Sequence, residues 1–403
     1  MDDEVIEGGK ISPPVFDLAN AKWPPNSVAC SSSGDIYLIG ENSTIFFSIS
    51  KSAENCQNKD RLPKFKKLEI ANFAQPVPNF SQLCFNASET ILLIWEPKCL
   101  GVLFASNRSI NSFNYHGENQ NELQFTLAGE EFLEEPDSCI LQAQWHPLSD
   151  YHVVFLLNTG VVAVINVVTG ATQDITLPSS LPFVSFTFGT GSGWLRFSIL
   201  LLTNDGRLYV LCPIIPSGCI VNNAIVEDLW SWLEYHMSLE SESNAPFRGL
   251  SDQELQLVNK YLTAGFGPPN SIPPHTSNAS FAETKPASEK VTYFGAYAAK
   301  EQQERNSTLY RILEATPLLQ GPFHVSLPSK SNSNRNTRTS IDLSIYGQVS
   351  DLLICPHHHC SAPVVAVSYA GGGVLLLLLD GEVRIAWTLC LCTELHLSVF
   401  IGI

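Results

Sequence analysis

The sequence predicts an all-β fold, a β-propeller with a small helical insertion. Three observations predict it. A β-hairpin pattern occurs five times, and the first four copies are spaced about 45 to 60 residues apart, as in four-stranded propeller blades. The length of 403 residues is one that a propeller reaches by repeating small sheets. With 44% hydrophobic and 15% charged residues, the chain also has enough apolar material for a folded core.

Each copy of the pattern consists of two short apolar runs joined by a few turn-forming residues. The copies share this layout although their sequences differ. The predicted hairpins are Asp35–Ile39 with Thr44–Ile49, Ile91–Trp95 with Leu100–Phe104, His152–Leu157 with Val161–Ile165, Phe197–Leu202 with Arg207–Leu211, and Val364–Ser368 with Val374–Leu379.

The long interval before the last hairpin predicts an insertion of different structure. Apolar residues three or four apart predict a first helix over Ile225–Leu239, and a capping box, Ser251-x-x-Glu254, opens a second helix for which Gly265 supplies the stop. From Gly267 to Thr339 the abundance of Pro, Ser, Asn and Thr predicts a mobile loop, with a short ordered stretch around Tyr310–Leu319. The apolar positions of the two helices are Val226, Leu229, Leu233 and Met237, then Leu255, Val258 and Leu262.

These patterns divide the chain into four segments. We expect an N-terminal tail at 1–25, propeller blades at 26–221, a helical insertion with a disordered loop at 222–345, and a further blade with a truncated C-terminal end at 346–403. The closing residues, Thr388–Ile403, have the composition of one strand or an apolar tail.

The charge and the cysteine content of the chain limit the kinds of partner and compartment that we expect for it. The 39 acidic and 23 basic side chains give a formal net charge of -16, which disfavours direct binding of nucleic acid and of anionic membrane surfaces. The eleven cysteines have no regular spacing and the amino end lacks a secretory signal, so we expect reduced thiols in the cytosol or nucleus. The most apolar tract, Val374–Leu379, is far shorter than the ~20 residues that cross a bilayer.

Three short motifs are candidates for chemistry, and a structural explanation is preferred for each. The run Cys355–Cys360 contains enough Cys and His to bind zinc, but no second ligand pair accompanies it, which favours a polar loop over a metal site. Cys390 and Cys392 alternate as on a strand, which favours core thiols over a redox pair. The glycine-rich run Gly189–Gly193 lacks the Lys-Ser/Thr of a phosphate loop and precedes a predicted strand. We therefore predict no catalytic, cofactor or metal residues and no enzyme.

One stretch also resembles a known family. Trp145–Asp150, followed by His152–Val162, is similar to a blade of the eighty-eight-kilodalton nucleoporin family, in which a Trp-x-Pro turn precedes a strand and its hairpin partner. From the residues alone, Trp145 fills space between blades and Pro147 fixes a turn. Further stretches resemble the neighbouring blades in the same order: Gln82–Ser88, Phe183–Gly189, and Leu318–Pro322 with the Val364 hairpin.

The resemblance implies a propeller of about seven blades, incomplete here, that acts as a non-catalytic scaffold on the cytoplasmic face of the nuclear pore complex. It implies other nucleoporins as partners, among them the autoproteolytic domain of a Gly-Leu-Phe-Gly nucleoporin, and a role in mRNA export and protein transport. The insertion Ile225–Gly265, or the loops beside it, is expected to help docking. The family's coiled coil has no counterpart, because no heptad pattern occurs. The alternative is a WD-repeat-type adaptor propeller of a coat or ubiquitin-ligase complex, although no hairpin ends in Trp-Asp.

Overall fold

The computed structural model describes about half of the chain in detail. The described residues are 28–32, 36–39, 45–48, 66–67, 70–71, 80–105, 123–191, 193–239, 251–269, 291–295, 313, 316–323, 325–326, 348–355, 363–380 and 398–401. They form two compact units, Met1–Asp137 and Ser138–Ile403, each with its own sheets.

The first unit contains two antiparallel sheets that correspond to the first two predicted hairpins. Strands β1 to β4 form one sheet in that order, and the second has the order β5-β9-β8-β7-β6, in which only the short β5 runs parallel to its neighbour. The strands are β1 (Val28–Cys30), β2 (Ile36–Ile39), β3 (Ile45–Ser48), β4 (Lys66–Lys67), β5 (Ile70–Ala71), β6 (Gln82–Phe85), β7 (Ile91–Glu96), β8 (Cys99–Ala105) and β9 (Leu123–Leu127).

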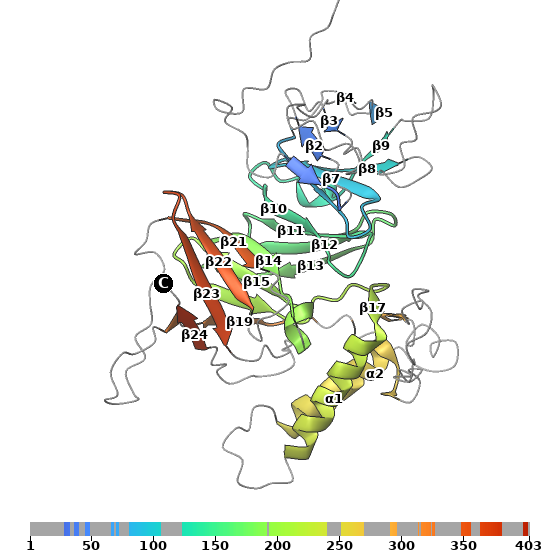
Figure 1. Ribbon diagram of the computed structural model, residues 1–403, viewed down its shortest axis with the longest axis vertical. Coiled ribbons are helices and arrows are strands. Elements are labelled where there is room, and N and C mark those ends of the chain that lie inside the picture. The colour runs from blue at the N-terminus through green and yellow to red at the C-terminus, as the bar shows by residue number, and fades with distance from the viewer. Residues whose placement is uncertain are drawn as a thin grey trace, which may run out of the picture. The chain divides into compact units, whose positions relative to one another are not determined.

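The second unit contains three larger sheets, ordered β10-β11-β12-β13, β14-β15-β16-β19 and β20-β24-β23-β22-β21 (Figure 1). Their strands are β10 (Ile140–Trp145), β11 (His152–Leu157), β12 (Val161–Asn166), β13 (Thr172–Thr176), β14 (Phe183–Phe188), β15 (Ile199–Thr203), β16 (Leu208–Leu211), β19 (Leu319–Phe323), β20 (Val325–Ser326), β21 (Val349–Cys355), β22 (Val364–Tyr369), β23 (Val374–Asp380) and β24 (Ser398–Ile401). All five predicted hairpins are confirmed as the pairs β2·β3, β7·β8, β11·β12, β15·β16 and β22·β23.

One hairpin begins later than predicted. The sequence places its first strand at Phe197, but Gly193–Phe197 form a short 3₁₀ helix and β15 begins at Ile199. The prediction that a strand follows the glycine-rich run directly was therefore wrong. Gly189 has a packing role, because a Cβ there would lie 1.8 Å from the carbonyl oxygen of Leu195.

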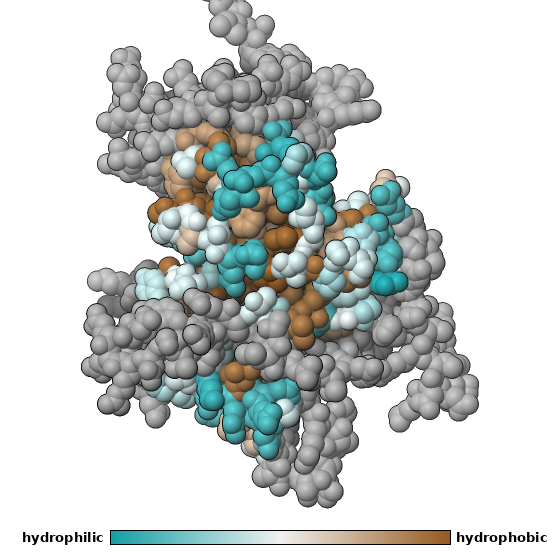
Figure 2. Space-filling view, turned by 180° about the vertical axis from the view of Figure 1, so that it is seen from behind, coloured by the Kyte–Doolittle hydropathy of each residue, from teal (hydrophilic) through white to brown (hydrophobic). Residues whose placement is uncertain are grey.

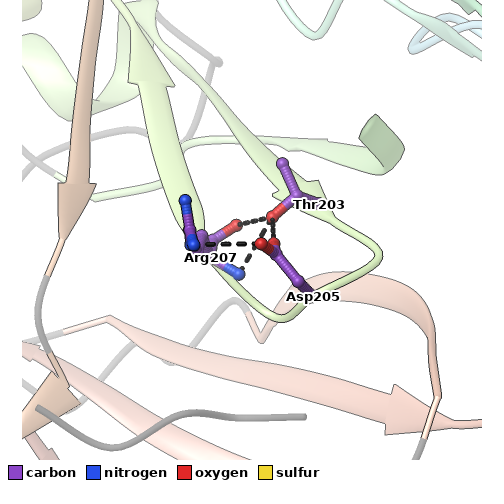
Figure 3. A network of polar contacts seen from close by, with 3 residues as sticks. All are labelled: Thr203, Asp205 and Arg207. Atoms are coloured by element: carbon purple, nitrogen blue, oxygen red, sulfur yellow. Dashed lines mark hydrogen bonds and ion pairs between the residues drawn. The ribbon is translucent and has the colours of Figure 1, made fainter. Parts of the chain in front are cut away.

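The turn of that hairpin shows why its register is fixed (Figure 3). The Thr203 hydroxyl accepts a hydrogen bond from the Arg207 amide at 3.0 Å and also contacts the Asp205 carboxylate, which forms an ion pair with Arg207 at 3.1 Å. Gly206 has φ of +80°, a conformation that suits glycine. The side chains of the turn thus satisfy the backbone groups that the turn leaves unpaired.

The innermost strands of the three larger sheets share a β-bulge at the same place. In β10, β14 and β21 the pairing register shifts between Ile140 and Gln142, between Phe183 and Ser185, and between Val349 and Asp351. The first residue after each bulge is polar. Because a bulge re-aims the following side chain, Gln142, Ser185 and Asp351 can reach the neighbouring inner strand.

These side chains form a polar belt, which we define as Gln142, Gln144, Ser185, Thr187 and Asp351. The Gln142 Oε1 accepts from the Phe186 amide at 2.7 Å, and Gln144 Nε2 donates to the Phe186 carbonyl at 3.4 Å. One blade further, the hydroxyls of Ser185 and Thr187 accept from the amides of Leu352 and Ile354. Ser185 Oγ also lies 2.9 Å from Gln142 Oε1 and 2.6 Å from Asp351 Oδ1. The belt therefore joins three successive inner strands. Its side chains form hydrogen bonds with backbone groups that strand pairing within the sheets leaves without a partner.

The helical insertion lies between β16 and β19. It contains β17 (Ile220–Asn222), α1 (Asn223–Leu239), α2 (Asp252–Phe266) and β18 (Val291–Tyr293), which pairs with β17. The predicted capping box is present: the Ser251 hydroxyl accepts from the Glu254 amide, and the Glu254 carboxylate accepts from the Ser251 amide at 2.6 Å.

Two predicted details of the insertion were wrong. Gly265 does not stop α2. It lies inside the helix against the ring of Phe294, and the C-cap is Gly267 with φ of +84°. Met237 does not share the buried face of α1 with Leu233, since 46% of its side chain is exposed at the last turn.

The interval predicted as a loop contains three strands, β18, β19 and β20, of which only β19 falls on a stretch that the resemblance assigned to a blade. β18 completes the small sheet of the insertion, and β19 is the outer strand of the sheet that starts with β14. Leu319–Phe323 therefore does not join the sheet of the Val364 hairpin, with which the resemblance grouped it. The four-segment division of the chain remains a prediction, and the tail at 1–25 and most of Thr388–Ile403 lie outside the described residues.

We expect Gln142→Leu to lower the free energy of unfolding by about 1 to 3 kcal/mol, because it leaves the Phe186 amide without its acceptor. Gln173→Leu on the exposed β13 removes the same polar group without a comparable contact and is the control. Urea unfolding of the three proteins measures the difference. Equal stability of the two variants would mean that the belt does not stabilise the blades.

We expect Gly265→Ala to destabilise the protein by about 1 to 3 kcal/mol, because the new Cβ would lie 2.2 Å from the Phe294 ring. Helix propensity alone predicts the opposite sign, a gain of about 1 kcal/mol. Urea unfolding of Gly265→Ala and of the double variant Gly265→Ala/Phe294→Leu distinguishes the two: a clash is relieved in the double variant. A stabilised single variant would contradict the packing argument.

Candidate interaction surface

The helical insertion is held to the sheets by a single large apolar core. Its buried side chains come from the 3₁₀ helix, from α1 and α2, from Phe294 after β18, and from strands β15, β16, β17, β19, β21, β22 and β23. A fully buried aliphatic or aromatic side chain contributes about 1.5 to 3 kcal/mol, so a core of this size fixes the helices firmly. The central members are Trp194, Phe197, Leu208, Val226, Leu229, Leu233, Val258, Leu262 and Phe294.

The opposite face of α1 is open to solvent and carries aromatic groups. Asp228, Ser231, Trp232 and Tyr235 have the spacing i, i+3, i+4, i+7, which places them on one side of the helix. Tyr235 is 60% exposed and Trp232 is partly buried. We call these four residues the α1 face.

Contacts within the helix hold these rings in place. The His236 ring stacks on Trp232 with centroids 4.2 Å apart, and Tyr235 meets the edge of His236 at 5.4 Å. His236 Nδ1 lies 2.9 Å from the Trp232 carbonyl, and Trp232 packs edge-on against the buried Trp194. The aromatic surface is therefore preorganised by the core beneath it.

The charged side chains of α1 are all acidic. Glu227, Asp228 and Glu234 carry them, and within the described residues none of the three is in an ion pair. The C-terminal end of a helix adds a partial negative charge. The exposed side of α2 presents Asp252, three amide side chains and Lys260. In Figure 2 the area that the two helices form is mainly hydrophilic, with a small hydrophobic area between the hydrophilic side chains.

Two other apolar areas are exposed in the same unit. On the β17·β18 pair, Ile220 and Tyr293 lie opposite each other and face solvent, 42% and 53% exposed. On the β21·β22·β23 sheet, Leu353, Val374 and Leu376 share the face opposite the core. Neither area carries the acidic groups that distinguish the α1 face.

One buried cluster resembles a nucleophile and its base, and its hydrogen bonds show otherwise. Ser149 Oγ lies 2.7 Å from His152 Nδ1, and His152 Nε2 lies 3.2 Å from Asn166 Nδ2. The Asn166 Oδ1 accepts from two backbone amides, so its NH₂ group must face the histidine. His152 Nε2 is then the acceptor and Nδ1 carries the proton, which it donates to Ser149. A serine that accepts from histidine is not activated as a nucleophile.

The second buried histidine fixes the turn after Trp145. The carbonyl of Ile214 accepts from His146 Nε2 at 3.0 Å, and His146 Nδ1 accepts from the Leu148 amide at 3.2 Å. Burial lowers the pKa of His146 from 6.5 to about 4, and it lowers the pKa of His152 to about 4 as well. Both rings are therefore neutral at pH 7 and have structural roles that the sequence analysis did not assign.

We expect the protein to lose stability as the pH falls from 7 to 5. The unfolded histidines take up protons near pH 6.5, whereas the folded ones do so only near pH 4, so protonation favours the unfolded chain across this window. His146 alone accounts for about 2 kcal/mol, and His152 acts in the same direction. Urea unfolding at both pH values measures the loss.

Two variants test the assignment of this pH dependence. His152→Asn keeps a donor near the position of Nδ1 and removes the titrating ring, so its loss of stability should be smaller than that of the natural chain. Gln173→Leu on the exposed β13 removes no titratable group and should leave the loss unchanged. An identical loss in His152→Asn and in the natural chain would contradict the assignment.

The other motifs that the sequence analysis considered form no metal site among the described residues. No three His, Cys, Asp or Glu side chains come close enough there to hold a metal ion. Most of Cys355–Cys360 lies outside the described ranges, as do Cys390 and Cys392, so these predictions remain untested. Trp145 is buried at the end of β10. The two α-helices are too short or too polar to span a bilayer, and the described part of the chain contains no other helix that could.

The blades and the helical insertion define the chain as a β-propeller protein. It resembles a chain in the crystal structure of the Chaetomium thermophilum heterotrimeric Nup82 NTD–Nup159 TAIL–Nup145N APD complex, with a TM-score of 0.60 and 14% identity, over 94% of this chain and 73% of that one. It likewise resembles a chain in the yeast heterotrimeric Nup82–Nup159–Nup116 nucleoporin complex, with a TM-score of 0.56 and 15% identity, over 94% and 75%.

A sequence match leads to the same group of proteins. The chain is 30% identical over 122 residues to the nuclear pore complex protein NUP88 of Arabidopsis thaliana, and this match covers 26% of the chain and 15% of that protein. No protein-family model matches the chain. The predicted resemblance to the N-terminal β-propeller of the eighty-eight-kilodalton nucleoporin family, and the propeller fold itself, are thus confirmed.

Proposed function

We propose that the chain is a non-catalytic scaffold of the nuclear pore complex, located on its cytoplasmic face. The observation that carries the proposal is the agreement of two independent likenesses. A sequence relative and two solved structures, found by unrelated criteria, are all nuclear pore proteins or their complexes. Neither likeness extends to the whole length of the proteins concerned, so the function of the chain is inferred from a part of them.

The chemistry of the described residues supports a scaffold. The cluster of Ser149, His152 and Asn166 has the wrong hydrogen-bond polarity for nucleophilic catalysis. The polar belt uses its side chains to join blades, and the net charge of -16 disfavours direct contact with RNA. A role in mRNA export and protein transport would thus be exercised through bound proteins.

Other nucleoporins are the proposed partners. The two similar structures are complexes of Nup82 with Nup159 and with either Nup145N or Nup116, and the first contains the Nup145N APD. We propose that this chain binds the corresponding autoproteolytic domain of a Gly-Leu-Phe-Gly nucleoporin. The helical insertion is a suitable docking element, because it is rigidly anchored and has an exposed aromatic face.

Affinity purification of the tagged chain from its own cells, at physiological salt, tests the proposal. We expect mass spectrometry to identify nucleoporins of the cytoplasmic face. Val154→Asp is the control, because Val154 is fully buried and a charge there unfolds the blade. The variant should recover chaperones in place of nucleoporins. Recovery of coat or ubiquitin-ligase subunits by the natural chain would contradict the pore assignment.

A further inference from the structure

We propose that a serine/threonine kinase phosphorylates Ser32, and that the phosphate releases the turn after β1 from the turn between β6 and β7. The two turns are joined by hydrogen bonds between Ser32 and Glu89, which we call the Ser32–Glu89 clasp. Both residues belong to the first unit, which does not contain the helical insertion. The modification goes beyond the proposed scaffold role and does not depend on it.

In the clasp, one carboxylate binds two groups of the same serine. The Ser32 amide donates to Glu89 Oε1 at 2.5 Å, and the Ser32 hydroxyl donates to Glu89 Oε2 at 3.2 Å. The two residues are 57 positions apart in the sequence. Hydrogen bonds to an ionised acceptor are stronger than those between neutral groups. The clasp therefore ties the chain after β1 to the sheet that contains β6 and β7.

The turn that presents Glu89 is held by a buried side chain. Asn86 Oδ1 accepts from the amides of Thr90 at 2.8 Å and Ile91 at 3.0 Å, and Asn86 Nδ2 donates to the hydroxyls of Ser88 and Thr90. Glu89 has φ of +55°, the only positive value of a non-glycine residue within the described ranges. A conformation of this kind persists where surrounding contacts impose it. The turn thus fixes the backbone position from which Glu89 reaches Ser32.

The two sheets that the clasp joins also share an apolar core. Tyr37 of β2 and Ile45 of β3 belong to the same buried cluster as Leu83 of β6 and Leu92 of β7. The Tyr37 ring meets the ring of Phe85 edge-on, with centroids 4.9 Å apart. Because this core does not involve Ser32, opening of the clasp would loosen the chain after β1 without separating the sheets.

Ser32 is accessible to a kinase, and its sequence neighbours suit one class of kinase. Ser32 is exposed in a turn, whereas the preceding Ser31 is buried. Exposed turns are the places where modifying enzymes reach a folded chain. In the sequence, Asp35 follows Ser32 by three positions. Kinases select substrates by the charges around the hydroxyl, and an acidic residue at this spacing is typical for acid-directed serine/threonine kinases.

Phosphoryl transfer changes both the charge and the hydrogen bonding of Ser32. The hydroxyl oxygen forms a bond with the γ-phosphorus of ATP, and the bond from that phosphorus to the bridging oxygen of the β-phosphate breaks. ADP leaves, and the hydroxyl proton passes to the catalytic aspartate of the kinase. The phosphate carries a charge of about -1.5 to -2 at pH 7, and the serine oxygen has no proton left to donate. Because this oxygen lies beside the Glu89 carboxylate, the like charges repel each other and open the clasp.

Treatment of the purified full chain with ATP and an acid-directed serine/threonine kinase tests the site. Tandem mass spectrometry should locate a phosphate on Ser32, and Ser32→Ala controls for phosphate at other positions. The same measurement is made on the chain purified from its own cells. Phosphate on Ser32 in either preparation supports the site, and its absence from both would overturn the inference.

Hydrogen–deuterium exchange of the full chain measures the release of the turn. Phosphorylation should make the amides of β1 and β2 exchange about 5- to 30-fold faster, because opening of the clasp lowers the local stability. Ser32→Glu should show part of this increase. Thr176→Glu on the exposed β13 adds the same charge without the contact and should leave these amides unchanged. Unchanged exchange in the phosphorylated chain would contradict the proposed release.

Reversal of the partner charge separates the clasp from a general effect of added charge. Glu89→Lys alone should speed the exchange, since the amide and hydroxyl of Ser32 lose their acceptor. In the double variant Ser32→Glu/Glu89→Lys the two charges attract each other, so the exchange should slow toward that of the natural chain. Equal exchange in Ser32→Glu and in the double variant would overturn the inference. Neither measurement uses a partner protein, so the outcome is independent of the pore assignment.

Discussion

The fold of the second unit depends on how its innermost strands satisfy their backbone groups. An inner strand has a paired neighbour on one side only, so half of its amides and carbonyls need other partners. Here the polar belt supplies partners from the preceding blade: Gln142 and Gln144 of β10 bond β14, and Ser185 and Thr187 of β14 bond β21. The bulge that precedes the first belt residue of each strand is what directs these side chains across the gap.

The belt also explains why the apolar residues can be so uniform. Because the polar side chains satisfy backbone groups of the inner strands, the faces between blades can be built from apolar residues. The strand pattern of β11, in which all six residues are buried, and the leucine-rich β15 fit this division of roles. The same rigid stack then supports the helical insertion, whose core continues from β15 and β16 into α1 and α2.

The hairpins could be predicted from the sequence because alternation and turn residues are local signals. The turn at Thr203–Arg207 and the capping box at Ser251 are examples in which four or five adjacent residues determine the structure. The residue pattern alone did not predict β19, although the resemblance placed Leu318–Pro322 in a blade. Its pairing with β16 spans the whole insertion, and its sequence contains Gly321 and Pro322, which normally argue against a strand. The role of Gly265 was misjudged for a similar reason: its constraint is the ring of Phe294, nearly thirty residues away.

The candidate surface was predictable only in its location. Periodicity identified the helix, but the exposure of Tyr235 and Met237 depends on where the apolar core beneath α1 ends, and that is a property of tertiary structure. The histidines illustrate the opposite case. His146 and His152 would be natural candidates for chemistry by residue type, yet burial and fully assigned hydrogen bonds commit both to structure. The described polar groups in the interior of this protein are thus used to hold its parts together, while Asp228, Glu234 and Tyr235 of α1 are exposed, which is the distribution expected of a scaffold.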